Sequence, residues 1–222
     1  MRILVTGCGR TGTQFMARVL SRLGLHVAHE TVYNHDLDPL ETDPAVIVAR
    51  WQDWDAEVSW LAAPLLGITP SDVAIWHQVR DPLKSLRCWF KHGILATDER
   101  AIHYAKTALS ECQEGDARHR GAAYVLGWNN MVEWRVVRCV SQRGSVLYRR
   151  YQIESLSAER LQYMLAEAGV MRSVAAIQGV LDGMPADLGT CQHGPEDNLT
   201  WADVPNGTAL REQAERYGYV YS

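Results

Sequence analysis

The stretch that decides the fold is Arg2-Ile-Leu-Val-Thr-Gly-Cys-Gly-Arg-Thr-Gly-Thr13. It begins with a short apolar run rich in β-branched residues, continues with closely spaced glycines, and leads into apolar residues at helical spacing from Phe15 to Leu23. A run of the first kind predicts a strand, and apolar positions three and four apart predict a helix. The stretch therefore predicts a strand, a tight loop and a helix, in that order.

A loop of this kind is suited to bind a phosphate group. The N–H groups that open a helix have no acceptor within the helix, and the positive end of the helix dipole lies at the same point. Glycines permit backbone conformations and close approaches that a β-carbon blocks. An arginine adds a planar set of donors, and threonines add hydroxyls. We therefore predict an anion site formed by Gly9, Arg10, Thr11, Gly12, Thr13 and Gln14.

The same glycines match one known nucleotide-binding motif and fail to match another. Gly7, Gly9 and Gly12 match the G-x-G-x-x-G of dinucleotide-binding proteins, which place an acidic residue about 20 residues further on. Glu30 lies near that spacing, so the loop alone leaves a dinucleotide site open. The G-x-x-x-x-G-K-[ST] motif of ATP and GTP hydrolases requires a lysine where this chain has Thr13. That class is therefore disfavoured.

Length and composition limit the classes of protein that fit. The chain has 222 residues, 47% of them hydrophobic, so we expect residues 1–222 to form a single domain with one sizeable core. A net charge of −4 argues against nucleic-acid binding through bulk charge. Five scattered cysteines without a C-x-x-C pair indicate neither a disulfide framework nor a zinc site. Without a signal peptide or a membrane span in the pattern, we expect a cytoplasmic protein with no membrane partner.

Candidate catalytic residues follow the next expected strand. Residues 25–28 predict a short strand that ends in His29 and Glu30. In an open α/β sheet, ligands bind beyond the carboxyl ends of the strands, so this pair is expected to face the same crevice as the loop. Glu30 is the first candidate for a general base and His29 the second. The alternative for Glu30 is a solvated loop carboxylate.

Two stretches have the composition of loops that border a site. Residues 31–54 contain aspartates, prolines and two tryptophans, Trp51 and Trp54, which form either a substrate wall or core packing. Residues 179–200 contain repeated glycines and prolines. Because long loops in a compact domain are usually functional, we predict lid or acceptor insertions near 31–60 and 179–200. Helices are expected over 58–64, 99–114, 117–142 and 156–169.

A second strand-loop-helix unit begins with the strongest strand of the chain, Val73-Ala-Ile-Trp-His-Gln-Val79. Its nearly continuous apolar character is typical of a buried parallel strand. Arg80 and Asp81 follow, and Pro82 is well placed in the first turn of a helix that extends to His92. An anion-binding loop and an arginine at the tip of a neighbouring strand suggest a ligand with two phosphate-like groups.

These two units resemble the nucleotide-binding motifs of sulfotransferases. Gly9-Arg-Thr-Gly-Thr13 is similar to their 5′-phosphosulfate loop, and Val79-Arg-Asp-Pro-Leu-Lys-Ser-Leu-Arg-Cys88 to their 3′-phosphate motif. The resemblance implies an α/β three-layer sandwich with a central parallel sheet and a topology like that of P-loop NTPases. It also implies 3′-phosphoadenosine 5′-phosphosulfate as donor, held by residues 9–14 together with Arg80 and Cys88. Cys88 replaces the usual serine and Gln14 a common threonine, so Ser85 or Arg87 is a possible substitute.

Weaker similarity to small bacterial and phage-type sulfotransferase-like proteins extends along the chain. The matching segments are His29-Glu30, Val58-Ser-Trp60, Tyr124-Val-Leu-Gly-Trp-Asn-Asn130, Ser145-Val-Leu-Tyr-Arg-Arg-Tyr151, Glu154-Ser-Leu156, Trp201-Ala-Asp-Val-Pro205 and Tyr217-Gly-Tyr219. In related bacterial enzymes a glutamate at the position of Glu30 serves as the base, so the resemblance supports that role.

The expected reaction is sulfuryl transfer to a hydroxyl or amine of a small-molecule or glycan-like acceptor. Arg10 is expected to stabilise the leaving phosphate oxygen, and Glu30 or His29 to accept the proton. No metal is expected in this scheme. Two alternatives stay open: a nucleotide or small-molecule kinase related to the P-loop proteins, and a nucleotide-binding module without catalytic activity. The sequence predicts neither the acceptor nor the oligomeric state.

Overall fold

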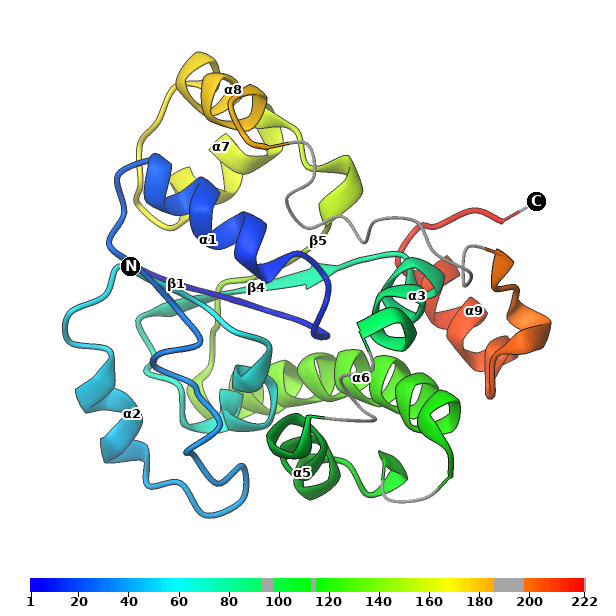
Figure 1. Cartoon of the computed structure of the whole chain (residues 1–222). Helices are drawn as coiled ribbons and strands as arrows, with labels where there is room; N and C mark the ends of the chain where they lie inside the picture. The colour runs from blue at the N-terminus through cyan, green and yellow to red at the C-terminus, as the bar shows by residue number, and fades with distance from the viewer. Residues whose placement is uncertain (93–97, 113–114, 186–197, 222) are drawn as a thin grey trace.

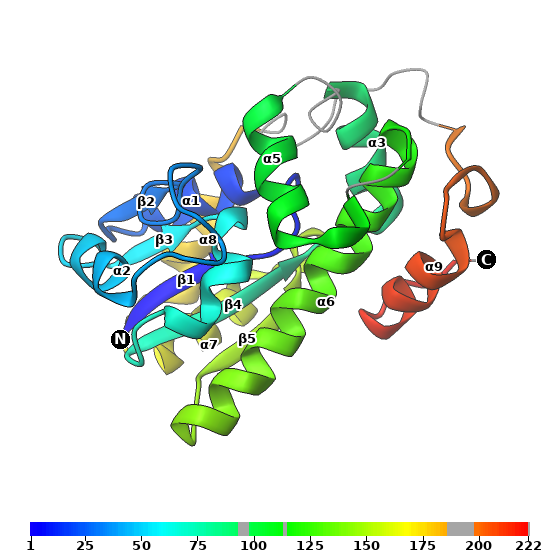
Figure 2. The same cartoon turned by 90° about the horizontal axis from the view of Figure 1, so that it is seen from below.

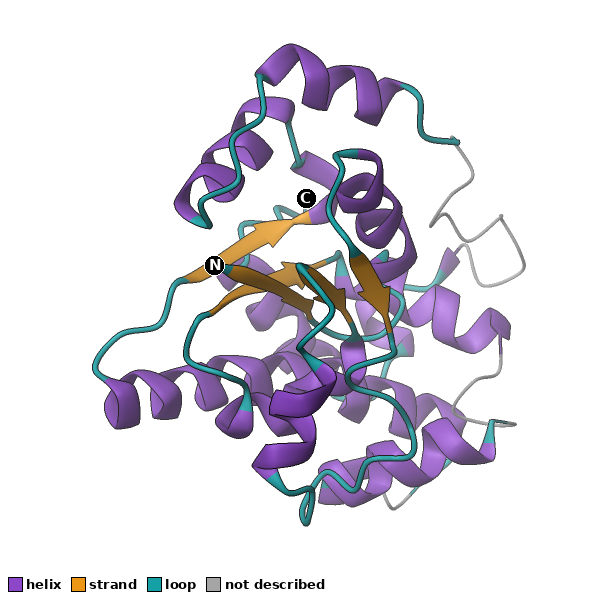
Figure 3. Cartoon of the chain, turned by 90° about the vertical axis from the view of Figure 1, so that its left-hand side faces the viewer, coloured by secondary structure: helices purple, strands orange, loops and turns teal. Residues whose placement is uncertain are grey.

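The structure is a computed structural model that describes residues 1–92, 98–112, 115–185 and 198–221. In this part of the chain, five strands form one sheet: β1 (Arg2–Thr6), β2 (Val27–His29), β3 (Ala56–Val58), β4 (Val73–Val79) and β5 (Tyr148–Gln152). Their order is β2-β3-β1-β4-β5, and every neighbouring pair is parallel. The predicted α/β fold with a central parallel sheet is confirmed, and Figure 3 shows the strands between layers of helices.

Strand β1 is the centre of the sheet. Ile3 is in register with Ala56 of β3 on one side and with Ala74 of β4 on the other. Successive side chains of a strand point to opposite faces. Accordingly, Ile3 and Val5 pack in one hydrophobic core and Leu4 in a second core across the sheet. Because both faces are covered, the three middle residues of the strand are all apolar, as the sequence indicated.

The helices that follow β1 and β5 cover one face of the sheet. They are α1 (Thr13–Arg22), α7 (Ala158–Glu167) and α8 (Val174–Asp182), and they lie above the sheet in Figure 1. Helix α1 buries Met16, Val19 and Leu20 against this face. Helix α7 has Ser157 as its N-cap and lies within the helix expected over 156–169.

The other face carries the longest helix, α6 (Ala117–Arg143), together with α3 (Pro82–His92), α5 (Glu99–Ala108) and the 3₁₀ helix η1 (Trp60–Ile68). Figure 2 shows α3 and α5 near one end of α6. Helix α2 (Pro44–Arg50), the short 3₁₀ helices η2 (Ser110–Cys112), η3 (Ile153–Ser155) and η5 (Trp201–Asp203), and helix α9 (Gly207–Arg216) complete the described elements.

The region from residue 31 to residue 66 differs from the sequence prediction. It contains an unpredicted strand, β3, and the predicted helix over 58–64 is a 3₁₀ helix that continues through Pro64. Strand β3 has only three residues, and its middle residue is Glu57. Its sequence therefore lacks the apolar run that predicts a buried strand. Residues 31–60 therefore contain helix α2 and strand β3 as well as loops. Most of the second predicted insertion, at 186–197, lies outside the described residues.

Within the described residues, no helix is both long enough and apolar enough to cross a membrane.

Candidate functional site

The loop between β1 and α1 is a tight turn at the carboxyl end of the central strand. Arg10 and Gly12 both have left-handed backbone conformations, with φ of 69° and 95°. Gly7 lies against β4 so closely that a β-carbon there would be 2.1 Å from the carbonyl oxygen of Gln78. A glycine is therefore required at position 7 for the loop to pack on β4.

Side chains from β4, from the residue directly after β4 and from α3 hold three successive carbonyl groups of the loop. Trp89 Nε1 donates to the Gly9 carbonyl at 3.1 Å, Arg80 Nη1 to the Arg10 carbonyl at 3.0 Å, and Gln78 Nε2 to the Thr11 carbonyl at 2.7 Å. Helix α1 then begins at Thr13 without a side-chain cap. With the carbonyls bound to the protein, the N–H groups of the first turn are the groups left to bind an anion.

A pair of aromatic side chains, Trp89 and Tyr124, also contacts the loop. The Gly9 N–H donates to the Tyr124 hydroxyl at 2.9 Å, and the rings of Tyr124 and Trp89 are 4.7 Å apart between centroids. A β-carbon at Gly9 would lie 2.8 Å from the Trp89 ring. These contacts link the loop to α3 and α6, which fixes its shape before any ligand binds.

Arg10 lies in a group of three charges. Burial lowers the pKa of Arg10, the Glu30 carboxylate opposes this change, and the Arg80 guanidinium adds to it. Among the described residues, the buried Nε of Arg10 has no hydrogen-bond partner. A buried donor without an acceptor is costly, so an anion bound at this point would satisfy it.

The two candidate bases lie together at the same edge of the sheet. His29 Nε2 is 3.9 Å from Glu30 Oε1 and 3.4 Å from the hydroxyl oxygen of Thr13, the first residue of α1. Burial raises the pKa of Glu30, while the charge of Arg10 opposes the increase. Burial lowers the pKa of His29. The first change makes Glu30 a stronger base than an ordinary glutamate, and the second keeps His29 neutral and able to accept a proton at neutral pH.

Glu57 is a further acidic residue that the sequence reasoning missed. It lies in β3, is fully buried, and accepts hydrogen bonds from the N–H groups of Thr31 at 3.1 Å and Val32 at 3.4 Å. Burial raises the pKa of Glu57 to about 7. The Glu57 carboxyl therefore holds the chain directly after Glu30, which has a left-handed φ of 54°. The only sequence signal is a glutamate between Ala56 and Val58.

The predicted 3′-phosphate residues follow β4. Arg80 Nε is 4.0 Å from Glu154 Oε1, and burial lowers the pKa of Arg80. Ser85 is buried at the first turns of α3. Cys88 is buried on α3, and a cysteine sulfur is at best a weak hydrogen-bond donor to a phosphate. Cys8, Cys112 and Cys139 are free. Arg80 is therefore the main cationic candidate on this side of the loop.

The other residues that the sequence suggested for the site include both buried and exposed side chains. Thr11 and Thr13 are buried, and Gln14 is exposed at the start of α1. Trp51 is fully buried with Nε1 donating to the Tyr33 hydroxyl, and Trp54 stacks on His26. Trp51 is therefore a core residue and not part of a substrate wall.

A comparison with solved structures gives one informative similarity. The sulfotransferase domain from the curacin biosynthetic pathway matches with a TM-score of 0.52 and 10% sequence identity, over 100% of this chain and 98% of that domain. At this identity the match shows a shared fold and does not assign a substrate. No protein-family model matches the sequence, and no curated protein matches it. The described residues contain no cluster of three or more histidine, cysteine or acidic side chains suited to hold a metal ion.

Proposed function

We propose that this protein is a sulfotransferase that moves a sulfuryl group from 3′-phosphoadenosine 5′-phosphosulfate to a hydroxyl or amine of an acceptor. The observation that carries the proposal is the loop at residues 7–12, whose three anchored carbonyls leave the α1 N–H groups and Arg10 for an anion. The fold shared with a sulfotransferase domain supports it.

The proposed donor has two phosphate positions, and the site offers two groups of donors. The loop N–H groups, Arg10 and the hydroxyls of Thr11 and Thr13 suit the 5′-phosphosulfate. Arg80, at the end of the adjacent strand, suits the 3′-phosphate, with Ser85 nearby on α3. Because both groups follow neighbouring parallel strands, one nucleotide bound beyond the ends of these strands can reach them together.

The bound donor supplies the sulfuryl group. In the proposed reaction the acceptor oxygen or nitrogen forms a bond to sulfur while the bond from sulfur to the 5′-phosphate oxygen breaks. The electron pair of that bond remains on the phosphate oxygen, where Arg10 and the loop N–H groups stabilise the charge. Glu30 accepts the proton from the acceptor, and its raised pKa suits that task. His29 is the alternative base.

The proposal is tested by incubating the protein with donor that carries ³⁵S in the sulfuryl group and with separate pools of phenols, saccharides and amines. The expected result is labelled acceptor together with adenosine 3′,5′-bisphosphate in equal amount. Transfer of the γ-phosphate from ATP–Mg²⁺ to the same pools would favour the kinase. Tight bisphosphate binding with no transfer to any pool or to water would favour a module without catalytic activity.

A further inference from the structure

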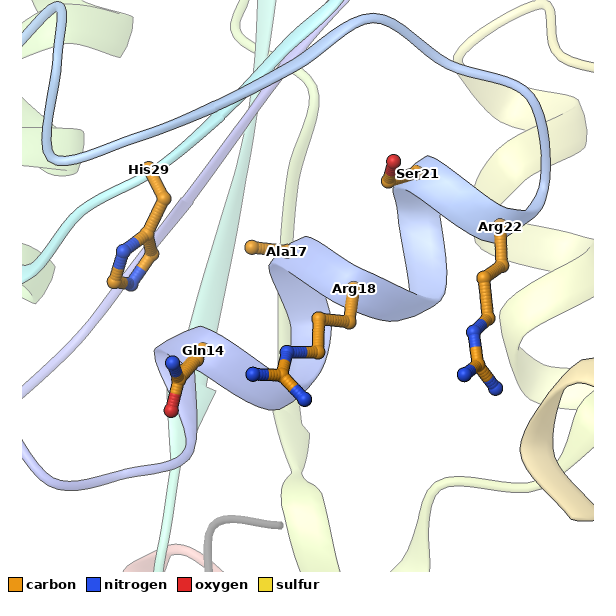
Figure 4. A pocket seen from close by; sticks show the side chains of 6 residues that line it. All are labelled: Gln14, Ala17, Arg18, Ser21, Arg22 and His29. Carbon is orange, nitrogen blue, oxygen red and sulfur yellow. The ribbon is translucent and has the colours of Figure 1, made fainter. Parts of the chain in front are cut away.

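A groove runs along the outward side of helix α1. Its volume is about 400 Å³, and it is lined by Gln14, Ala17, Arg18, Ser21, Arg22 and His29 (Figure 4). The five helical residues are spaced three and four apart, so they form one face of α1. The opposite face carries the buried Met16, Val19 and Leu20. The side chains of Ala17 and Ser21 are small, so they leave open the space between Gln14, Arg18, Arg22 and His29.

Two arginines give the groove a positive charge, and the Glu30 carboxylate lies beyond its His29 end, 3.9 Å from His29 Nε2. Among the described residues, Arg18 has neither a hydrogen-bond nor an ion-pair partner, and no acidic side chain lines the groove. Arg22 donates from Nη1 to the carbonyl oxygen of Gly183 at 2.6 Å, which leaves its other donors available. Arg22 also lies in the last turn of α1, where a positive charge favours the helix dipole. Arg18 lies in the middle of the helix and has no such stabilising role.

The groove begins at the proposed reaction centre. His29 lines it and also lies 3.4 Å from the Thr13 hydroxyl and 3.9 Å from Glu30. A ligand in the groove therefore has one end beside the candidate bases and its other end beside the arginines. The 3′-phosphate residues follow β4, on the other side of β1 from His29, so the groove does not compete with them for the donor.

We propose that this groove binds the acceptor and that the acceptor is anionic, with a carboxylate, sulfate or phosphate group held by Arg18 and Arg22. This inference rests on the proposed sulfotransferase function. The helix also sets the length of the acceptor. With a rise of 1.5 Å per residue, Arg18 and Arg22 lie about 7.5 and 13.5 Å along α1 from Thr13. The anionic group should be separated from the reacting hydroxyl or amine by a distance in this range.

A series of ω-hydroxy acids of four to twelve carbons provides probes of graded length, and the diol of equal length is the neutral control for each. Binding is measured by NMR titration of the α1 amides, without donor. We expect at least tenfold tighter binding of the longer acids than of their diols, and loss of this preference in the variant Arg18→Gln/Arg22→Gln. The variant Arg138→Gln, which removes an exposed charge from α6, should keep it. Alkyl sulfates and phosphates of the best length then identify the preferred anion.

Equal binding of acid and diol, or the same preference in the double variant, would overturn the proposal. Calorimetry with adenosine 3′,5′-bisphosphate on the same variants separates this inference from the proposed function. The bisphosphate Kd should agree within twofold between the double variant and the unmodified protein. If the bisphosphate binds and the acids do not, the acceptor assignment fails while the donor assignment stands. If the bisphosphate does not bind at all, the proposed function itself fails.

Discussion

Arg80 Nη1 donates a hydrogen bond of 3.0 Å to the carbonyl oxygen of Arg10, which joins the end of β4 to the middle of the anion-binding loop. One arginine thus has two tasks in the proposed site. It orients a loop carbonyl away from the ligand, and it offers positive charge to a second phosphate. The two residues are 70 positions apart in the sequence, so this link exists only in the folded chain.

Replacing Arg80 should weaken donor binding. The variant Arg80→Ala loses a charged hydrogen bond to the loop and the cation for the 3′-phosphate. Each charged hydrogen bond contributes about 1.5–3 kcal/mol, so we expect the bisphosphate Kd to rise by roughly ten- to a hundredfold. Calorimetry measures this, with Arg160→Ala on α7 as the control. An unchanged Kd would show that Arg80 does not contact the bound nucleotide.

Replacing Arg10 should affect catalysis more than binding. Arg10→Ala removes the side chain that stabilises the leaving phosphate oxygen, and such a loss costs about 3 kcal/mol, or about a hundredfold in rate. The measurement is a single-turnover rate with labelled donor bound at saturation. Arg10→Lys should recover part of the rate, because it restores a positive charge without the planar donor set. An unchanged single-turnover rate in Arg10→Ala would exclude this role.

Glu30 should determine the acidic limb of the pH profile. A base acts when it is deprotonated, and burial raises the pKa of Glu30. Activity should therefore increase over a pH range that is higher than the range in which an ordinary glutamate titrates. Glu30→Gln should lower turnover and remove this limb while the bisphosphate Kd stays the same. If Glu30→Gln is fully active and His29→Ala is not, His29 is the base.

Glu57 should make the stability of the fold depend on pH. Its pKa is raised to about 7, so the folded state binds a proton that the unfolded state releases near pH 4.3. The stability of the protein relative to Glu57→Gln should therefore be greatest below about pH 4.3 and fall as the pH rises to about 7, by up to about 4 kcal/mol. Urea unfolding at pH 4.5 and 8 measures the difference, and the exposed Glu212→Gln serves as control. The same difference from the unmodified protein at both pH values would contradict the assignment.

The sequence predicted the parts of the fold that have local signals. Strand β4, its arginine and the helix that starts at Pro82 are recognisable from neighbouring residues alone, and so is the glycine loop before α1. The same holds for β2, whose end brings His29 and Glu30 to the edge of the sheet where the loop lies.

The remaining features depend on partners that are distant in sequence. Gln78, Trp89 and Tyr124 anchor the loop from positions that are 67, 80 and 115 residues away from the groups they bind. Strand β3 escaped prediction because a buried carboxylate is compatible with a strand only when backbone N–H groups satisfy it, and those of Thr31 and Val32 do so. Neither relationship can be deduced from local pattern.

The identity of the donor is the central claim, and a calorimetric titration with adenosine 3′,5′-bisphosphate tests it most directly. We expect one site per chain and binding at least a hundredfold tighter than that of 5′-AMP, because only the bisphosphate reaches both the loop and Arg80. ATP–Mg²⁺ and NAD should bind no better than 5′-AMP. If the bisphosphate binds no more tightly than 5′-AMP, or if ATP–Mg²⁺ or NAD binds more tightly than the bisphosphate, the sulfotransferase proposal is wrong.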